Sequence, residues 1–347
     1  MKINRQRRWR IIKNFATGWI AGFVFLSIVR GSGTVEQGSV QLALPAAIGM
    51  SVLLGAIFGG FAGMVQIAME ERAYRRIPLH RLLALRVLFA VMSLGALVLL
   101  SYGIMTRFSG VTIGFGEFLV EPGSFALYLY ILSVDFFLVL LRQINLMIGD
   151  GNLWRLLRGR FYEPREEERI FMFLDLKSST KHAEDLGHVT YSRLVQDCFD
   201  DLGVVSDFGA EVYQYVGDGV VLTWPLAGGL HDQNCLHAFR GFQDRLESRR
   251  DYYTRRYGRA PSFTAAINAG VVTVTEVGRH KREIAYHGDT INTAARVQGK
   301  CKTFGRDLLV TSGLWNLLGD SSFGHEELGE ISLRGKEEPV GIVAVDV

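Results

Sequence analysis

The first 148 residues contain four apolar stretches, each long enough to cross a membrane as a helix. They run approximately over Ile12–Val29, Leu42–Met69, Leu82–Ile104 and Phe125–Ile148. A helix needs about 20 consecutive, mostly apolar residues to cross the hydrocarbon core of a bilayer. The first stretch is the weakest of the four, because Lys13 and Asn14 lie at its start. We therefore predict an α-helical, four-span membrane domain over residues 1–148.

The placement of lysine and arginine predicts how these spans are oriented. Basic residues gather before the first span and between the second and third, at Lys2, Arg5, Arg7, Arg8, Arg10, Lys13, Arg72, Arg75, Arg76 and Arg81. The other two loops offer little more than Arg30 and Arg107. Because basic loops stay in the cytoplasm, we expect a multi-pass protein of the plasma (inner) membrane, with its N-terminus and its second half cytoplasmic. A signal peptide is disfavoured, since the first span lacks a small-residue cleavage site and three more spans follow.

A few polar and small residues in the membrane half are candidates for a role there. Asp135 lies near the middle of the fourth span, with Arg142 two turns later and Arg86 on the third span. A structural Asp–Arg pair and a ligand or proton sensor are both open interpretations of this carboxylate. Gly55, Gly59 and Gly63 recur every four residues, which lets another helix approach closely. Packing inside one subunit is favoured over a contact between subunits.

Residues 149–168 form a predicted linker between the two halves. Trp154, Arg155, Leu156, Leu157 and Arg158 suggest a short amphipathic helix at the lipid headgroups, and the sequence then reaches Pro164. The linker could be a passive tether or could transmit motion of the membrane domain, and the sequence leaves both open.

The second half, residues 169–347, has the charge content of a soluble globular domain. The formal net charge of the chain is only +3, which gives no reason to expect nucleic acid as a partner. The three cysteines, Cys198, Cys235 and Cys301, form no CxxC pair. They fit a reducing compartment and are not expected to bind metal.

Periodicity in this half predicts helices that alternate with mostly antiparallel strands. The predicted strands are Ile170–Leu174, a hairpin of Glu211–Val216 and Gly219–Trp224, a strand pair within Phe263–Thr275, and Ile331–Val347. The predicted helices are Lys177–Leu186, Tyr191–Phe208, His231–Tyr257 and Thr290–Lys300. This order predicts an α+β sandwich.

Two aspartates each follow an apolar, strand-like run at a sharp turn. Asp175 ends Ile-Phe-Met-Phe-Leu-Asp, and Asp218 lies in Tyr-Val-Gly-Asp-Gly-Val-Val. Two carboxylates on adjacent strand ends can hold a pair of Mg²⁺ ions with a triphosphate. Taken alone, each signal is weak, because Gly-Asp is usually only a turn and an Asp before Ser-Ser-Thr is often a helix cap. Asn292 and Arg296 could likewise be polar surface positions of a helix.

Combined and in order, these blocks resemble the catalytic domain of the class III nucleotidyl cyclases, the adenylate and guanylate cyclases of the bacterial membrane-anchored type. The blocks are Phe-Leu-Asp175-Leu-(x)₃-Thr180, Tyr-Val-Gly-Asp218-Gly-Val-Val and Gly-Asp-Thr-Ile-Asn292-Thr-Ala-Ala-Arg296. The resemblance covers residues 165–347. It implies a ferredoxin-like sandwich with a mostly antiparallel sheet.

The resemblance implies a role for each matching residue. Asp175, Asp218 and the backbone carbonyl of Leu176 would ligate two Mg²⁺ (or Mn²⁺) ions. Asn292 would orient the ribose, and Arg296 would stabilise charge on the α-phosphate, because residues at i and i+4 share one helix face. Arg334 falls where the family has a phosphate-binding lysine, with Lys336 as a close competitor. The turn formed by Lys177, Ser178, Ser179 and Thr180 would offer backbone N–H groups to phosphates.

The family builds its site from two subunits, so the resemblance implies a homodimer with two composite sites. Three positions depart from the pattern. Gln214 stands where the family places a base-reading lysine or glutamate, Ala285 where it has the second base reader, and Thr264 where some members have arginine. An amide can donate and accept, so base selectivity is less constrained than the chemistry.

The leading hypothesis is therefore a membrane-anchored enzyme that converts ATP to cyclic AMP and pyrophosphate. The alternatives are a guanylate cyclase, which would use GTP, and a non-catalytic nucleotide-sensing receptor. A transporter is disfavoured, because the spans contain no paired broken helices.

Overall fold

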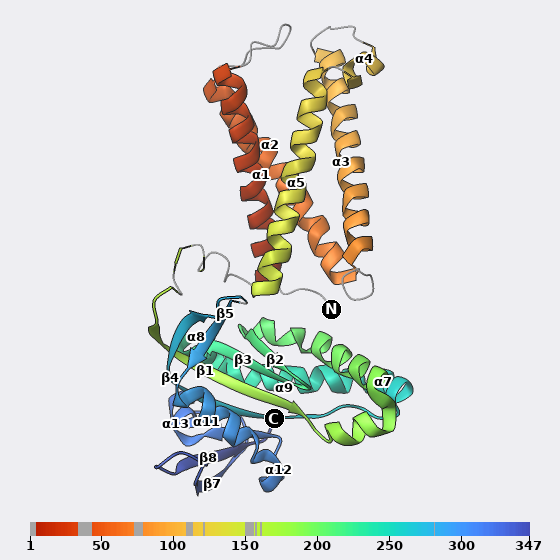
Figure 1. The fold of residues 1–347 in the computed structure, drawn as a ribbon. Coiled ribbons are helices and arrows are strands. Elements are labelled where there is room, and N and C mark those ends of the chain that lie inside the picture. Colours follow the sequence, from red (N-terminus) through yellow and green to blue (C-terminus); the bar gives the residue numbers. More distant parts are fainter. Residues whose placement is uncertain are drawn as a thin grey trace. The chain divides into compact units, whose positions relative to one another are not determined.

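The chain divides into two compact units, Met1–Ile144 and Asn145–Val347. The computed structural model describes residues 5–33, 44–72, 79–108, 114–120, 122–149, 156, 158–159, 162–280 and 282–347. The first unit is made of helices, and the second is a sheet with helices on its faces (Figure 1).

The described residues of the first unit form four long helices and one short one. They are α1 (Arg5–Gly33), α2 (Leu44–Arg72), α3 (Leu79–Phe108), α4 (Phe115–Val120) and α5 (Pro122–Ile148). Among the described residues, three segments are long and apolar enough to cross a membrane: Arg7–Val29, Leu44–Glu71 and Phe125–Ile148. The described part of α3 contributes a shorter apolar segment, Ala84–Gly95. Three of the four predicted spans thus meet the length and hydropathy that a bilayer requires, and the third span remains a prediction.

The glycines of α2 bring α1 into close contact within the first unit. A Cβ atom added at Gly55, Gly59 or Gly63 would lie 2.6, 2.6 and 2.9 Å from a Cα atom of α1. Real Cβ atoms essentially never come that close to a backbone atom. The predicted packing within one subunit is therefore confirmed, because these positions admit only glycine at this helix separation.

Buried ion pairs join the helices of the first unit. The Arg86 guanidinium donates to both carboxylate oxygens of Asp135, at 3.1 and 2.7 Å. Arg142 instead donates to Glu70, at 2.9 and 3.0 Å. Asp135 therefore pairs with Arg86 of α3. Removing one partner of such a buried pair costs about 3–5 kcal/mol, because the other charge stays buried.

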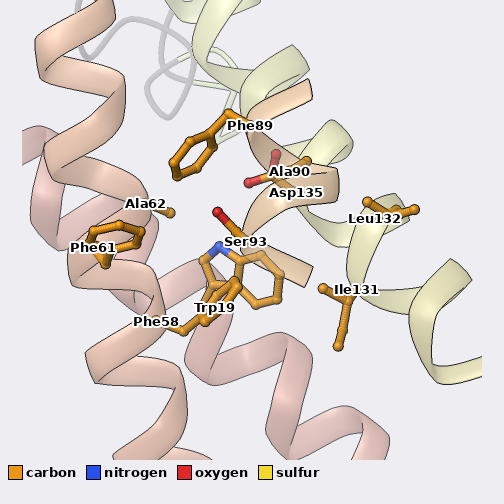
Figure 2. Close-up of a pocket in the computed structure, with 10 residues that line it drawn as sticks. All are labelled: Trp19, Phe58, Phe61, Ala62, Phe89, Ala90, Ser93, Ile131, Leu132 and Asp135. Atoms are coloured by element: carbon orange, nitrogen blue, oxygen red, sulfur yellow. The ribbon is translucent and has the colours of Figure 1, made fainter. Parts of the chain in front are cut away.

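A small cavity lies beside this ion pair. Figure 2 shows Asp135 and the Ser93 hydroxyl among apolar neighbours, with the indole nitrogen of Trp19 turned toward Ser93. The other lining residues are apolar: Phe58, Phe61, Ala62, Phe89, Ala90, Ile131 and Leu132. The Asp135 carboxylate is thus held by one arginine in an otherwise apolar interior.

The second unit is built on one eight-stranded sheet. Its strands are β1 (Arg165–Leu176), β2 (Glu211–Val216), β3 (Gly219–Pro225), β4 (Phe263–Val277), β5 (Glu283–His287), β6 (Leu308–Thr311), β7 (His325–Ile331) and β8 (Val340–Val345). The strand order is β2-β3-β1-β4-β6-β8-β7, and β5 pairs with β4. Only the β4–β6 pair is parallel among the described strands. The predicted mostly antiparallel sheet is confirmed, and the β1–α–β2–β3–α–β4 order is that of a ferredoxin-like sandwich.

Helices cover both faces of this sheet. They are α7 (Ser179–Leu202), η1 (Gly203–Phe208), α8 (Leu226–Leu230), η2 (His231–Gln233), α9 (Asn234–Ser248), α10 (Arg250–Tyr257), α11 (Asp289–Gln298), α12 (Cys301–Phe304) and α13 (Ser312–Leu318). The largest core forms where α7, α9, α10 and α13 pack on one face. On the other face, α11 packs on a smaller cluster that includes Phe171 and Val221. The three cysteines are free and buried.

Several predicted element boundaries were wrong. Phe263–Thr275 is one long strand, β4, whose hairpin partner is β5. The helix predicted over His231–Tyr257 is divided into η2, α9 and α10. Ile331–Val347 is strand only at its start and over Val340–Val345. The two helices predicted over Lys177–Leu186 and Tyr191–Phe208 are largely one helix, α7, which begins at Ser179 and is kinked at Gly187. Apolar periodicity alone does not locate such breaks, because they depend on the backbone between apolar positions.

The predicted linker lies partly outside the described residues. Trp154, Arg155 and Leu157, which suggested an amphipathic helix, belong to the part of the chain that is not described. β1 begins at Arg165, inside the segment 149–168, because Arg165–Glu168 pair with residues 271–274 of β4.

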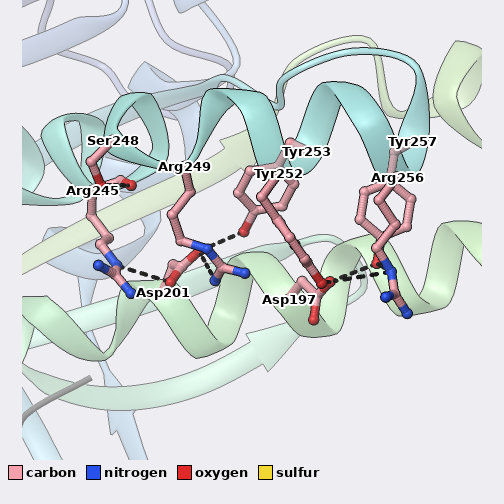
Figure 3. Close-up of polar contacts among 9 residues, drawn as sticks. All are labelled: Asp197, Asp201, Arg245, Ser248, Arg249, Tyr252, Tyr253, Arg256 and Tyr257. Atoms are coloured by element: carbon pink, nitrogen blue, oxygen red, sulfur yellow. Dashed lines mark hydrogen bonds and ion pairs between the residues drawn. The ribbon is translucent and has the colours of Figure 1, made fainter.

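Two aspartates of α7 clamp this helix to α9 and α10 (Figure 3). Asp201, with a fully buried side chain, accepts hydrogen bonds from Arg245, Arg249 and Tyr253 at 3.0, 2.6 and 2.7 Å. Asp197 accepts from the hydroxyls of Tyr252 and Tyr257, at 2.6 Å each. These bonds fix α7, whose first turn follows the end of β1 that carries Asp175.

Candidate active site

Asp175 and Asp218 lie at the same end of the sheet. The side chains of Leu174 and Leu176 enter the main core, so Asp175 between them points to the face that carries α11. Asp218 lies in the two-residue turn between β2 and β3, where Gly217 has a φ of 61°. A Cβ atom at Gly219 would lie 3.4 Å from Asp175 Oδ1. Pairing of β1 with β3 therefore brings the two predicted metal-binding aspartates together.

The electrostatics of this pair suit a bound cation. Burial raises the pKa of Asp175, and the nearby charge of Asp218 raises it further. Hydrogen bonds from Gln298 and from the backbone of Leu176 oppose this increase in the pKa. Asp218 Oδ2 is buried and has no hydrogen-bond partner among the described residues. Oxygen ligands are what Mg²⁺ and Mn²⁺ prefer, so the carboxylates fit the predicted ions.

The protein contributes few ligands at this position. Among the described residues, no group of three or more His, Cys, Asp or Glu side chains could hold a metal ion. Asp175 and Asp218 supply two carboxylates, and Leu176 offers only its backbone carbonyl, because a leucine side chain has no ligating atom. Further ligands would have to come from a bound phosphate or from water, as is usual for Mg²⁺.

Tyr191 of α7 is a site residue that sequence reasoning missed. Burial and the charge of Asp218 raise the pKa of Tyr191 to about 12, and the Tyr191 hydroxyl also interacts with Ser179. The phenol therefore stays protonated at neutral pH and can donate to the carboxylates. The sequence marked Tyr191 only as the start of a helix, and no local pattern indicated that it faces the β2–β3 turn.

The turn between β1 and α7 leads into the helix without a side-chain cap. Ser178 adopts a left-handed conformation with a φ of 56°, and α7 begins at Ser179. The backbone N–H of Lys177 donates to Ser262, and its ammonium pairs with Asp307. Lys177 is thus already engaged. The first N–H groups of the helix, at Ser179 and Thr180, are those that a helix leaves for a ligand.

Helix α11 places Asn292 and Arg296 one turn apart. Asn292 is exposed, whereas Arg296 is half-buried. Arg296 Nη1 has no hydrogen-bond partner within the described chain. Two donors on one helix face can contact one ligand, and the buried guanidinium nitrogen is available for an anion.

The turn that contains Arg334 and Lys336 lies against this helix. Lys336 Nζ donates to Asp289 at 2.7 Å and to Thr293 at 3.4 Å. The hydrogen bond from Lys336 lowers the pKa of Asp289. A Cβ atom at Gly335 would lie 3.6 Å from Arg296 Nη2. Arg334 is exposed. Because Gly335, which lies between Arg334 and Lys336, is the residue next to Arg296, the choice between these two phosphate contacts stays open.

The candidate site residues form two sets, and no hydrogen bond or ion pair among the described residues joins the aspartates of one set to the arginine of the other. Asp175 and Asp218 form one set at the β1 and β2–β3 ends, and Arg296 belongs to the other on α11. Among the described residues, Gln298 of α11, which sequence reasoning also missed, forms hydrogen bonds at the end of the sheet that carries the carboxylates. It donates to Thr264 at 3.2 Å and to Asp175. Thr264 is the register partner of Asp175 on β4, so it supports the carboxylate end through Gln298.

The two predicted base-reading positions lie on different strands. Gln214 is exposed on β2, opposite Val221 and directly after a bulge. Ala285 is half-buried on β5, opposite Thr275. The residues beside them touch, because the rings of Tyr213 and Tyr286 have centroids 5.0 Å apart.

Comparison with known proteins gives a consistent result. The family model of the adenylate and guanylate cyclase catalytic domain matches residues 161–343. Adenylate cyclase 2 of Rhizobium meliloti (strain 1021) is 29% identical over 350 residues, covering 97% of this chain and 92% of that protein. An adenylate cyclase of Anabaena cylindrica is 25% identical over 50% of this chain and 36% of its own length.

A solved structure shows the same fold. A bacterial light-regulated adenylyl cyclase has a TM-score of 0.54 and 18% identity, and the match covers 66% of this chain and 67% of that one. The family model covers more than half of the chain. The protein therefore belongs to the adenylate and guanylate cyclase family, and it is a nucleotidyl cyclase.

Proposed function

We propose that this protein is a membrane-anchored adenylate cyclase that converts ATP to 3′,5′-cyclic AMP and pyrophosphate for intracellular signalling. The observation that carries the proposal is the closeness of Asp175 and Asp218 at the end of the sheet, where their two negative charges repel each other. The preference for ATP is supported by the similarity of nearly the whole chain to adenylate cyclase 2 of Rhizobium meliloti.

In this proposal, Asp175, Asp218 and the Leu176 carbonyl hold two Mg²⁺ or Mn²⁺ ions. When bound, such ions offset the charge of the triphosphate and lower the pKa of the ribose 3′-hydroxyl. In the reaction, the 3′-oxygen bonds to the α-phosphorus, the bond from that phosphorus to the pyrophosphate oxygen breaks, and the hydroxyl proton is released.

The remaining site residues bind and orient the nucleotide. Asn292 holds the ribose, and Arg296 donates to the α-phosphate oxygens as their charge increases. Arg334 or Lys336 binds the departing pyrophosphate. The N–H groups of Ser179 and Thr180 bind phosphate at the start of α7, where the helix dipole favours an anion. Tyr191 donates to Asp218 and so orients that carboxylate.

A homodimer is proposed because no hydrogen bond or ion pair among the described residues joins Asp175 or Asp218 to Arg296, and buried atoms of Asp218 and Arg296 have no partner there. The aspartates of one subunit would face Asn292 and Arg296 of α11 in its partner. The α11 face of the sheet offers an apolar surface for this, since Val216 at its edge is 55% exposed and Phe173 is only half-buried. The buried Arg296 nitrogen without a partner is consistent with a site completed by a second subunit and its nucleotide.

The membrane domain is proposed to anchor the enzyme in the plasma membrane, with its N-terminus and catalytic unit in the cytoplasm. Three apolar helices support an anchor, and the arginine-rich N-terminal segment and the basic residues between α2 and α3 support this orientation. The cytoplasmic side is also where the nucleoside triphosphate would be available.

A guanylate cyclase is the alternative, and the base-reading positions are the reason. Ala285 has no side-chain hydrogen-bonding group, and the amide of Gln214 can pair with adenine or guanine. The test is turnover of ATP and of GTP by the purified full chain, with Mg²⁺, with Mn²⁺ and with a chelator. We expect cyclic AMP as the main product and no product with the chelator. Equal or faster turnover of GTP would overturn the choice of ATP.

A further inference from the structure

The two base-reading positions lie on strands that are not neighbours in the sheet. β2 pairs with β3 at one edge, whereas β5 pairs only with the far end of β4 among the described strands. Backbone pairing therefore sets the spacing between Gln214 and Ala285 only indirectly, through β3, β1 and β4. Some side-chain contact has to fix it if both residues are to face one nucleotide base.

Tyr213 and Tyr286 supply that contact, and each is the chain neighbour of a base-reading residue. Their rings meet edge to face, with an interplanar angle of 76°. The backbone N–H of Tyr286 donates to the Tyr213 hydroxyl at 3.4 Å. The bulge between Val212 and Gln214 inserts Tyr213 as the extra residue of β2, and such bulges re-aim side chains next to functional sites.

Arg169 supports the tyrosine pair from beneath. Its guanidinium is 2% exposed and lies 5.0 Å from the centroid of the Tyr286 ring. It donates to Thr223 at 3.0 Å, to Glu167 at 3.1 Å and to Glu211 at 2.9 Å. A guanidinium with all three of its nitrogens bonded is held in one orientation.

The contacts of the Arg169 guanidinium join residues of four strands. Glu167 is on β1, Glu211 on β2, Thr223 on β3 and Tyr286 on β5. The Tyr286 ring also packs edge to face on Phe171 of β1, with centroids 5.4 Å apart. Aromatic pairs of this geometry contribute about 0.5–1.5 kcal/mol beyond the area they bury. The contacts of Tyr286 with Arg169, Phe171 and Tyr213 together therefore hold β5 in position.

We infer that Arg169, Tyr213 and Tyr286 are positioning residues for base selection, because they set the spacing between Gln214 and Ala285. This inference rests on the proposed function only in taking Gln214 and Ala285 as the residues that face the base. Neither tyrosine needs to touch the nucleotide. Loosening the pair would move the two base-reading strands apart while leaving Asp175, Asp218 and Arg296 in place.

The test is the affinity of the full chain for 3′-deoxy-ATP and 3′-deoxy-GTP, measured by equilibrium dialysis. These analogues lack the attacking hydroxyl, so binding is separated from cyclisation. Tyr213→Phe removes only the hydroxyl that accepts from Tyr286. Tyr215→Phe is the matched control, because Tyr215 lies on the same strand but packs on Phe199 of α7.

We expect Tyr213→Phe to change the ratio of the two dissociation constants about three- to tenfold toward unity, the effect of one lost hydrogen bond. KM for the preferred triphosphate should rise in parallel, with kcat changed less than about twofold. Tyr215→Phe should keep the wild-type ratio. Tyr286→Leu also loses the ring contacts, so it should reduce the preference for one analogue further. Tyr286→Phe keeps those contacts and should retain most of the wild-type preference.

Two results would overturn the inference. One is an unchanged ratio in both Tyr213→Phe and Tyr286→Leu, whether or not their thermal stability falls, because the tyrosines would then be only core residues. The other is a wild-type chain that binds both analogues equally, since no selection would exist to be positioned. A wild-type preference for the guanine analogue would instead contradict ATP as the substrate, and the shift in Tyr213→Phe would still decide the inference.

Discussion

The negative charge of Asp175 is unfavourable in the folded protein, because the carboxylate is partly buried and lies beside Asp218. Its pKa is raised by burial and by Asp218, so the ionised form destabilises the folded chain at neutral pH. A bound cation would reverse this penalty, and so would removal of the charge. The same residue can therefore be tested by stability as well as by activity.

We predict that Asp175→Asn raises the melting temperature in chelator by a few degrees and lowers cyclase activity about 100-fold or more. The amide keeps the shape of the side chain but is not repelled by Asp218. Thermal unfolding with and without Mg²⁺ measures the first effect: Mg²⁺ should stabilise the wild type and not the variant. Asp320→Asn, at an exposed carboxylate, controls for net charge. A variant that melts lower in chelator would contradict the assigned repulsion.

His182 makes the stability of the catalytic unit depend on pH. The imidazole is 4% exposed and its Nδ1 has no hydrogen-bond partner among the described residues. Burial and then the charge of Arg259 lower its pKa below the ordinary value of 6.5. The unfolded chain thus binds a proton more readily than the folded one. The stabilisation is complete above pH 6.5 and is lost as the pH falls from there through the folded-state pKa.

We predict that the free energy of unfolding of the wild type falls between pH 6.5 and about pH 5, where histidine is the main side chain to titrate. His182→Gln should remove most of that slope, because glutamine has no proton to take up. Urea titrations at a series of pH values measure it. An equal slope in the variant and the wild type would assign the pH dependence to other groups.

Residues were predictable from sequence where a local pattern exposed them. Asp175 and Asp218 follow apolar runs at turns, and Asn292 and Arg296 share a helical spacing. Arg169, Gln298 and Tyr191 gave no such signal, because their partners are distant in the chain. Arg169, for example, bonds Thr223, which is 54 residues away. Which residues meet at that distance depends on strand register, and single-sequence patterns do not determine register across a sheet.

Elements were predictable where their apolar period was strong. The β2–β3 hairpin was expected over Glu211–Val216 and Gly219–Trp224, and it lies there with one more residue at its end. β4 was wrongly predicted as a strand pair within Phe263–Thr275, whereas its residues, Ala269 and Gly270 included, continue the pairing with β1. The four-residue strand β6 was missed, since its sequence, Leu-Leu-Val-Thr, is too short to show a period.

The contact of α1 with α2 provides an element-scale prediction. Gly59→Ala should destabilise the membrane unit by about 1–3 kcal/mol, the usual cost of overpacking a core. A methyl group there would meet the backbone of Ala16 and Phe15 of α1. Gly60→Ala is the control, because a Cβ at Gly60 meets nothing within 4 Å. Unfolding of the purified protein in detergent measures both, and equal stability of the two variants would contradict the close approach.

At the scale of the whole molecule, the sequence divides where its composition changes. Apolar residues fill the first unit, and charged residues return in the second, so the two units could be expected before any contact was known. The completed site is a different matter. Among the described residues, no hydrogen bond or ion pair joins Asp175 or Asp218 to Arg296, and the proposed homodimer would bring the aspartates of one chain to Arg296 of the other.

We therefore predict that two inactive variants restore each other when they are produced together. Asp218→Asn lacks a metal ligand, and Arg296→Ala lacks the α-phosphate contact, so a homodimer of either has no complete site. A mixed dimer has one site with both defects and one intact site. With random pairing, half the dimers are mixed, which gives about a quarter of wild-type activity. Cyclic nucleotide formed by the purified mixture measures this. Activity no higher than that of the separate variants would place all four residues in one subunit's site and contradict the composite homodimer.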